Sequence, residues 1–173
     1  MLLRRTHDSG ATLPELMISV LLLGAFFASI YEVNAVCLRY IGASKENVAA
    51  IQGVQDRLET LRNLTYTNLV DKNFLKNNVL ASTANSSDFM KNVTETITVK
   101  AYDTDNNPGG PTGSGIVVQK VPGGAADFVG TPDPNVASAA TVLVEVQYDW
   151  RMTFGQRART ERTASIVTNG VKK

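Results

Sequence analysis

The chain begins with a nearly unbroken apolar stretch that carries one carboxylate at its start. Residues 16–31 read LMISVLLLGAFFASIY, and Glu15 stands directly before them. Apolar runs of about 20 residues are typical of helices that cross a membrane. An ionised acid in such a helix costs about 2.5–3.5 kcal/mol at the bilayer centre on insertion scales, and less near the interface. We therefore expect Glu15 to be a functional residue that needs a cationic partner.

The residues around Glu15 form a longer pattern. Residues 10–18 read GATLPELMI and follow a short leader that contains Arg4 and Arg5. This pattern resembles the class III signal of type IV pilins and pseudopilins, which is a basic leader ending in glycine, then x-Thr-Leu-x-Glu and a long apolar run. The resemblance covers residues 4–31. It departs from the family at Ala11, where Phe or Met is usual, and at Pro14, where a long aliphatic residue is common.

The resemblance implies how the chain is processed and which residues are involved. A prepilin peptidase would cut after Gly10 on the cytoplasmic side and N-methylate the new terminus at Ala11. Thr12 and Leu13 would belong to the recognition motif. Glu15 would become the fifth residue of the mature chain, where the family keeps a glutamate that sets assembly register. The implied partners are the prepilin peptidase, other pilin or pseudopilin subunits, an inner-membrane assembly platform and membrane lipid.

Elementary chemistry gives Glu15 the same kind of partner. Cleavage after Gly10 would create an α-ammonium at Ala11, about one helical turn away. Residues four apart share a helix face, so the two charges can pair within one chain. Alternatively, the amine of an incoming subunit neutralises Glu15 of its neighbour. The family resemblance favours the pairing between chains, and a plainer alternative is that Glu15 only caps the helix start with Thr12.

Other kinds of N-terminal segment fit less well. A secretory signal has an apolar core of about 7–15 residues that ends in a small-residue cleavage site. Here the run is longer, begins at a glutamate and ends in the sequence IYEV at residues 30–33. Arg4 and Arg5 would keep the leader in the cytoplasm by the positive-inside rule, with the remainder of the chain outside. An ordinary uncleaved membrane anchor stays open.

Composition fits one modest extracytoplasmic domain behind such an anchor. The 173 residues include 17 Lys and Arg against 16 Asp and Glu. Without the leader, which holds Arg4, Arg5 and Asp8, the balance is 15 against 15. The chain therefore lacks the overall basic excess that would indicate binding to nucleic acid or to an anionic membrane surface. The single cysteine, Cys37, excludes an internal disulfide framework.

The helical pattern predicts one long helix from about residue 12 to residue 63. We expect residues 11–38 to be its transmembrane and assembly half, where Gly24, Ala25, Ala28 and Ser29 would let helices pack closely. Residues 39–63 have an amphipathic pattern that predicts docking on a sheet. Their apolar positions are Ile41, Val48, Ile51, Val54, Leu58 and Leu61, and their polar positions are Lys45, Glu46, Gln52, Asp56, Arg57 and Glu59.

Residues 64–173 read as a β-sheet domain with long loops. We expect a connector over 64–92 with a short helix near 70–76, and strands at 93–102, 116–121, 142–151 and 156–168. The last two strands should form a hairpin, with Trp150 as a core anchor. Residues 103–115 and 122–140 are rich in Gly and Pro and predict loops. The fold class is therefore α+β, a long N-terminal helix on an antiparallel meander, and this is also the pilin fold.

Few residues suggest catalysis or metal binding. Asp103, Asp105 and Asn107 alternate as in a calcium loop, but Pro108 stands where an EF-hand needs glycine. Ordinary turn chemistry explains the same residues. The only histidine, His7, lies in the leader, and no nucleophile, acid–base or metal-ligand set is apparent in the mature chain. We therefore expect neither an enzyme nor a cofactor.

These observations predict a structural subunit of a type IV pilus or type II secretion pseudopilus. The subunit would be held once in the inner membrane, with its N-terminus cytoplasmic and its domain outside. The long loops and Ala11 favour a minor subunit. The alternative is a membrane-anchored extracytoplasmic β-domain that binds a ligand or protein and does not polymerise. That alternative predicts no cleavage at Gly10 and indifference to Glu15→Ala.

Overall fold

The chain folds as an α+β protein with a long N-terminal helix and one antiparallel sheet. A computed structural model describes residues 12–82, 88–103 and 109–170. The chain divides into two units, residues 1–41 and 42–173, and helix α1 (Leu13–Arg62) contributes to both. The second unit contains a five-stranded sheet packed against the second part of α1. The predicted helix and fold class are confirmed at this level.

Helix α1 begins where the sequence predicts. The N–H of Leu16 donates to the Thr12 carbonyl oxygen at 3.1 Å, which closes the first turn. Pro14 lies in this turn, where the missing N–H of proline has no intrahelical partner to lose. No proline follows before the helix ends at Arg62. The helix is thus continuous over 50 residues.

The connector after α1 is built from short helical turns. These are α2 (Tyr66–Leu69), α3 (Lys72–Phe74), a π-turn η1 (Leu75–Val79) and a 3₁₀ turn η2 (Asp88–Asn92). The Asp71 side chain accepts hydrogen bonds from the N–H groups of Asn73 and Phe74 and caps α3. Helical turns therefore occupy more of the connector than the single helix predicted near 70–76. The fully buried side chains of Leu69, Leu75 and Leu80 cover the core.

The strands follow a Greek-key order. They are β1 (Thr94–Asp103), β2 (Gly110–Lys120), β3 (Ala126–Phe128), β4 (Thr141–Arg151) and β5 (Ala158–Thr168). Their order in the sheet is β3-β2-β1-β4-β5, and all neighbours are antiparallel. The fourth strand returns beside the first, so the predicted meander is wrong. β3 is only three residues long and offers β4 little edge, whereas β1 has eight residues paired with β4.

The two segments predicted as loops contain regular structure. β2 starts at Gly110, well inside the predicted loop 103–115, and the β1–β2 register shifts between Val99 and Ala101. Gly115 at this irregularity has a φ of +75°, and an added Cβ would lie 2.6 Å from the Val99 carbonyl oxygen. A glycine is therefore needed at position 115 because β2 is distorted there, and not because the segment is a loop. The predicted loop 122–140 holds β3 and the 3₁₀ turn η3 (Pro134–Ser138).

β4 and β5 form the predicted hairpin, with paired residues from Thr141 opposite Thr168 to Arg151 opposite Ala158. The predicted inward face of β4 is confirmed. It consists of Val142, Val144, Val146, Tyr148 and Trp150, which are all buried. The Trp150 ring packs edge-on against Phe89, with 5.6 Å between centroids. Trp150 is thus a core anchor, as expected.

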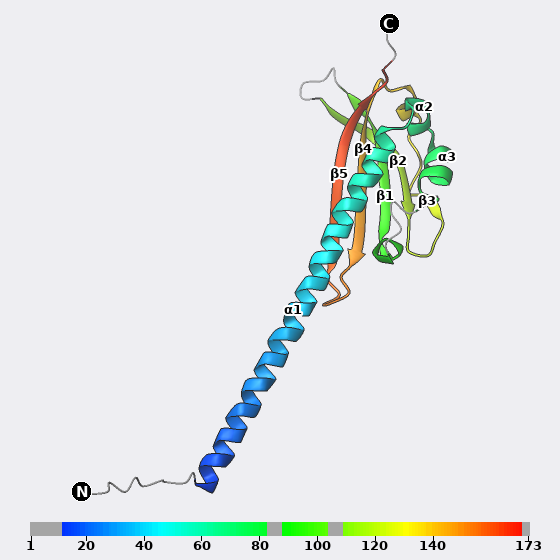
Figure 1. Ribbon diagram of the computed structural model, residues 1–173. Coiled ribbons are helices and arrows are strands. Elements are labelled where there is room, and N and C mark those ends of the chain that lie inside the picture. Colours follow the sequence, from blue (N-terminus) through cyan, green and yellow to red (C-terminus); the bar gives the residue numbers. More distant parts are fainter. Residues whose placement is uncertain (1–11, 83–87, 104–108, 171–173) are drawn as a thin grey trace, which may run out of the picture. The chain divides into compact units, whose positions relative to one another are not determined.

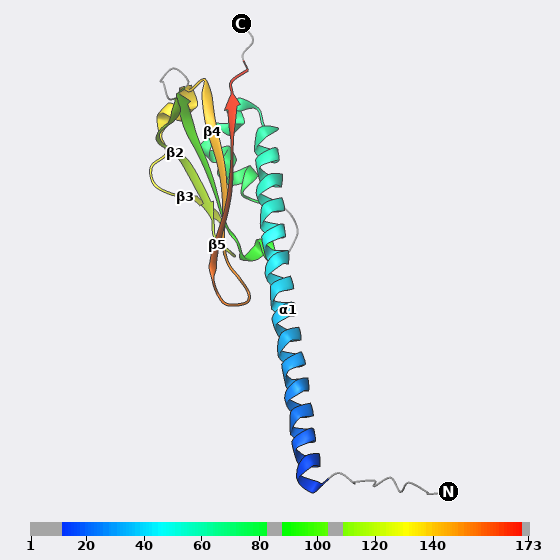
Figure 2. The same cartoon turned by 90° about the vertical axis from the view of Figure 1, so that its left-hand side faces the viewer.

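The second part of α1 lies along one face of the sheet (Figures 1 and 2). Its buried residues are Ala50, Gly53, Val54, Arg57 and Leu61. The predicted apolar stripe is therefore only partly correct, because Val48 and Ile51 remain 50% and 43% exposed. The helix is turned so that its small residues meet the sheet. A Cβ at Gly53 would lie 2.8 Å from a Tyr148 ring carbon and 3.0 Å from the Met90 sulfur.

We expect Gly53→Ala to destabilise the second unit although alanine favours helix. The helix gains about 1 kcal/mol of propensity, but overpacking against Tyr148 and Met90 costs about 1–3 kcal/mol. Urea unfolding of the full chain in detergent, followed by the fluorescence of the single Trp150, measures the difference. Gly24→Ala is the matched control, since an added Cβ there has no neighbour within 4 Å. A Gly53→Ala variant as stable as the parent would contradict this packing.

Candidate functional sites on the long helix

The helix start brings together three residues of the predicted signal. Thr12 precedes α1, Leu13 is its first residue, and Glu15 lies in its first turn. The Thr12 N–H donates to Glu15 Oε2 at 3.4 Å, which is one half of a capping box. A carboxylate in this turn is also favoured by the helix dipole. Gly10 and Ala11, the predicted cleavage and methylation positions, lie outside the described residues.

The Glu15 carboxylate keeps acceptor capacity for another partner. Within the described part of the chain, the Thr12 N–H is the one hydrogen-bond donor to this side chain. An ionised carboxylate can accept about four hydrogen bonds. The capping bond therefore uses only part of the acceptor capacity of Glu15.

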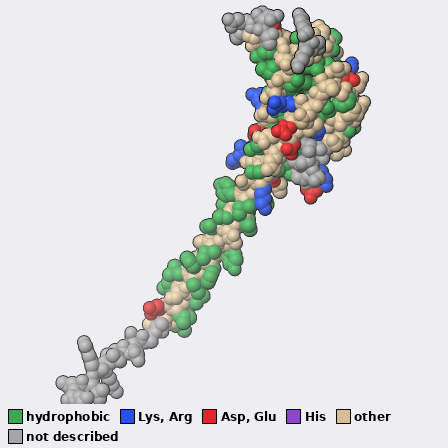
Figure 3. Space-filling model, turned by 45° about the horizontal axis from the view of Figure 1, so that its top comes forward, with side chains coloured by type: hydrophobic (Ala, Val, Ile, Leu, Met, Phe, Trp, Pro, Cys, Tyr) green, Lys and Arg blue, Asp and Glu red, His purple; other side chains and the backbone are tan. Residues whose placement is uncertain are grey.

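An exposed apolar surface follows Glu15. Every residue from 12 to 41 is exposed, and hydrophobic side chains cover this segment in Figure 3. Among the described residues, α1 is the one helix long and apolar enough to cross a membrane. Soluble monomers rarely expose contiguous apolar patches larger than a few hundred Å². By its length and composition this segment could span a membrane.

Two serine hydroxyls within this apolar segment donate to backbone carbonyl groups of the same helix. The hydroxyl of Ser19 donates to the Glu15 carbonyl oxygen at 2.8 Å, and the hydroxyl of Ser29 donates to the Ala25 carbonyl oxygen at 2.9 Å. Such back-bonding suits a helix in lipid, where an unsatisfied polar group is costly. Ser29 and Ala25 belong to the small positions expected to permit close helix packing.

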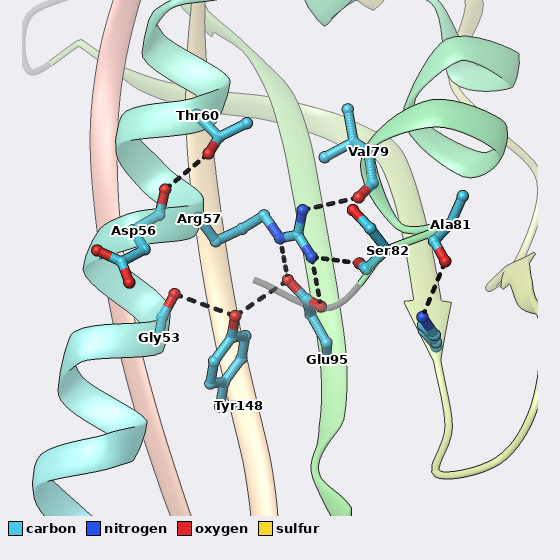
Figure 4. A network of polar contacts seen from close by, with 10 residues as sticks. Gly53, Asp56, Arg57, Thr60, Val79, Ala81, Ser82, Glu95 and Tyr148 are labelled. Atoms are coloured by element: carbon cyan, nitrogen blue, oxygen red, sulfur yellow. Dashed lines mark hydrogen bonds and ion pairs between the residues drawn. The ribbon is translucent and has the colours of Figure 1, made fainter. Parts of the chain in front are cut away.

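A second polar centre lies in the core of the second unit (Figure 4). Arg57 of α1 forms a buried ion pair with Glu95 of β1, in which Nε and Nη2 donate to the two carboxylate oxygens. Its Nη1 donates to the Val79 carbonyl oxygen and its Nη2 to that of Ser82, each at 2.7 Å. Arg57 and Glu95 are only 3% and 4% exposed. One guanidinium thus joins helix, sheet and connector.

Tyr148 of β4 completes this network. Its hydroxyl lies 3.1 Å from the Gly53 carbonyl oxygen and 3.2 Å from Glu95 Oε1. Burial, and then the negative charge of Glu95, raise the pKa of Tyr148 above its usual value. Burial lowers the pKa of Arg57, but its hydrogen bond and attraction to Glu95 outweigh this and raise it overall. The network therefore joins the Arg57–Glu95 ion pair to a phenol whose raised pKa keeps it neutral at neutral pH.

The sequence analysis placed Arg57 on the solvated side, and this was wrong. Arg57 lies four residues after Gly53 and four before Leu61, so it shares the buried face. Glu95 alternates with the buried Ile97 and therefore points inward on β1. An inward acid on a strand, together with a cation on the helix face, was the signal that could have predicted the pair.

The predicted calcium residues are only partly described. Asp103 is the last residue of β1 and pairs with Gly110 of β2 in the ladder. Asp105 and Asn107 lie outside the described residues. Among the side chains that the structure does describe, no group of three or more His, Cys, Asp or Glu could hold a metal ion.

Comparisons of the chain with protein-family models, curated proteins and solved structures found no match. The interpretation of the helix start and of the buried network therefore rests on the residues of this chain.

We expect Arg57→Met to destabilise the second unit by about 3–5 kcal/mol, because it leaves the Glu95 charge buried without its partner. A double variant, Arg57→Met with Glu95→Leu, should recover much of this loss, since an apolar pair of similar volume often replaces a buried ion pair without cost. Urea unfolding read by Trp150 fluorescence tests both variants. Arg62→Met, at an exposed position of the same helix, is the control, and an equal effect of Arg57→Met and Arg62→Met would refute the role of the pair.

Stability should fall at alkaline pH, partly through Tyr148. A group whose pKa is higher in the folded state stabilises fully below its unfolded pKa, about 10 for tyrosine, and this contribution is lost as pH rises further. Tyr148→Phe should therefore be less stable at neutral pH by about 1–3 kcal/mol, with a shallower decline above about pH 10. Urea unfolding at a series of pH values measures both slopes.

Tyr66→Phe provides the comparison for this alkaline series. Burial also raises the pKa of Tyr66, whose hydroxyl donates to the Ala139 carbonyl oxygen at 2.6 Å. The two tyrosines therefore act in the same direction, but Tyr148 also faces the Glu95 charge. An alkaline decline that Tyr148→Phe leaves unchanged would show that its phenol does not contribute.

Proposed function

We propose that the chain is a prepilin-like structural subunit and not an enzyme. It would be processed by a prepilin peptidase and assembled, as a minor subunit, into a type IV pilus or a type II secretion pseudopilus. The observation that carries the proposal is a helix whose residues 12–41 are all exposed and mostly apolar, with Glu15 in its first turn. The α+β layout of a long helix on an antiparallel sheet is consistent with a pilin-like fold.

In this proposal the leader and the apolar segment have separate roles. Arg4 and Arg5 hold the leader in the cytoplasm, and the apolar segment crosses the inner membrane. In the membrane, lipid covers the exposed side chains, and the domain lies outside. In the polymer, neighbouring helices replace lipid as the cover, and the small residues at positions 24, 25, 28 and 29 allow their close approach.

Glu15 gives assembly its register in this proposal. Cleavage after Gly10 releases the α-ammonium of Ala11 on the incoming subunit. That cation reaches the Glu15 carboxylate of a neighbour, whose capping bond from the Thr12 N–H occupies only part of its acceptor capacity. The pair removes an isolated charge from lipid, so the correctly staggered arrangement is favoured over others. The partners are the peptidase, sister subunits and the inner-membrane assembly platform.

Glu15→Gln tests the register directly. The variant should insert at least as well as the parent, because a neutral amide costs less in lipid than a carboxylate. It should still lose its first ten residues in cells that make a prepilin peptidase, as measured by intact mass. It should be depleted from the sheared polymer fraction. Glu32→Gln, at an exposed carboxylate farther along the same helix, is the matched control and should assemble normally.

Two outcomes would favour the alternative of an anchored β-domain that does not polymerise. One is an unchanged mass when the peptidase is present, with residues 1–10 retained. The other is equal recovery of the parent and Glu15→Ala in every fraction. Either result would contradict the proposed subunit role while leaving the fold intact.

A further inference from the structure

The turn between β4 and β5 has a fixed shape. It spans residues 152–157 after Arg151, the last residue of β4, and the Met152 N–H donates to the Arg157 carbonyl oxygen at 3.0 Å across its base. Gly155 and Gln156 take left-handed conformations, with φ of +82° and +50°. Glutamine in this region is uncommon and needs surrounding contacts to hold it. We call residues 151–157 the β4–β5 tip.

The β4–β5 tip is attached to α1 at a defined place. The Thr153 N–H donates to both Glu46 carboxylate oxygens, at 3.1 and 3.3 Å. The Phe154 ring lies over Gly42, where an added Cβ would be 3.3 Å from a ring carbon. Gly42 follows Ile41 directly, and Ile41 ends the run in which every described residue is exposed. The tip therefore contacts the helix at the point where the chain leaves its apolar segment.

The β4–β5 tip exposes an aromatic ring and several cations. Phe154 is 50% exposed although it contacts the helix. Arg151, Arg157 and the nearby Arg159 of β5 are exposed as well. The composition of the whole chain does not reveal this local group of arginines, because its positive and negative charges nearly balance.

Three acidic groups near the tip have hydrogen-bond or ion-pair partners of their own. Glu46 accepts the Thr153 N–H, and Asp88 pairs with Lys91 at 2.7 Å. Asp149 accepts hydrogen bonds from Gln147 and Thr160. Within the tip itself, residues 151–157, the charged side chains are Arg151 and Arg157, and both are exposed.

We propose that the β4–β5 tip binds phospholipid headgroups and holds the domain on the membrane surface. This inference rests on the proposed insertion of α1. Arg39 and Tyr40, which directly precede Ile41, are residue types that mark the interface at the end of a transmembrane helix. The tip contacts Gly42 and so belongs at headgroup depth. Guanidinium groups bind phosphate in bidentate fashion, and an exposed ring gains from leaving water.

Lipid fits the β4–β5 tip better than a second protein. A stable protein interface buries about 800 Å² on each partner, which is more than one half-exposed ring and a few flexible arginines offer. A headgroup layer needs no shape complementarity, and it attracts each added cation when the lipids are anionic. The tip thus has the chemistry of a peripheral lipid contact.

Site-specific quenching in full-length protein tests the proposal. In a Cys37→Ser background, Thr153→Cys places an environment-sensitive fluorophore on the tip and keeps Phe154. Thr168→Cys, exposed at the opposite end of β5, is the matched control. In vesicles of phosphatidylglycerol and phosphatidylcholine with a headgroup spin label, quenching should be strong at position 153 and weak at 168. It should fall at position 153 in pure phosphatidylcholine and at high salt.

Variants of the tip separate its two contributions. Arg151→Gln with Arg157→Gln should reduce quenching at position 153 in anionic vesicles to the level seen in phosphatidylcholine. Phe154→Ser should reduce quenching in both kinds of vesicle, because the ring contributes independently of lipid charge. Fluorescence of Trp150 confirms that each variant is folded. Equal quenching at positions 153 and 168 in folded, inserted protein would overturn the proposal.

Failure of this proposal can be told apart from failure of membrane insertion. Resistance of the chain to alkaline extraction from the vesicles reports the insertion of α1. A chain that resists extraction but shows no quenching at 153 overturns the lipid contact alone, as does a cross-link from position 153 to a second copy. A chain that is extracted overturns both proposals.

Discussion

The buried ion pair between Arg57 and Glu95 fixes how the second unit is assembled. It is the one ion pair in the core of the described chain, and it connects α1, β1 and the carbonyl groups of Val79 and Ser82 in the connector. Neither charge can leave its partner without a large desolvation cost. We infer that the pair sets the rotation and height of the helix on the sheet, which apolar contacts alone would specify less narrowly.

The tight approach at Gly53 depends on the same arrangement. The Tyr148 hydroxyl lies within hydrogen-bond distance of both the Gly53 carbonyl oxygen and Glu95. The tyrosine therefore contacts the helix and β1 at the same time. A larger residue at position 53 would push against the tyrosine ring. The polar network and the close packing therefore depend on each other. Gly53 permits the close approach of helix and sheet, and the Arg57–Glu95 pair fixes where that approach occurs.

Patterns within short stretches of sequence predicted those features that depend on neighbouring residues in the chain. Alternation in β4 predicted its buried face through Trp150, and the apolar run with Glu15 predicted the helix start. Strand order was not predictable in the same way, because the pairing of β1 with β4 joins distant segments. The burial of Arg57 also depends on a partner 38 residues away. Of the predicted signal, Thr12, Leu13 and Glu15 have a described geometry, and Gly10 and Ala11 do not.

The Greek-key order leaves the central strand β1 incomplete until late in synthesis. β2 follows β1 at once, but Thr94 of β1 pairs with Asp149, so the second neighbour is finished only near the C-terminus. Until then β1 presents an open edge, and such edges recruit strands from other chains. Pairings between distant segments also form slowly. A growing chain is thus vulnerable to misassembly for a time, until β4 pairs with β1.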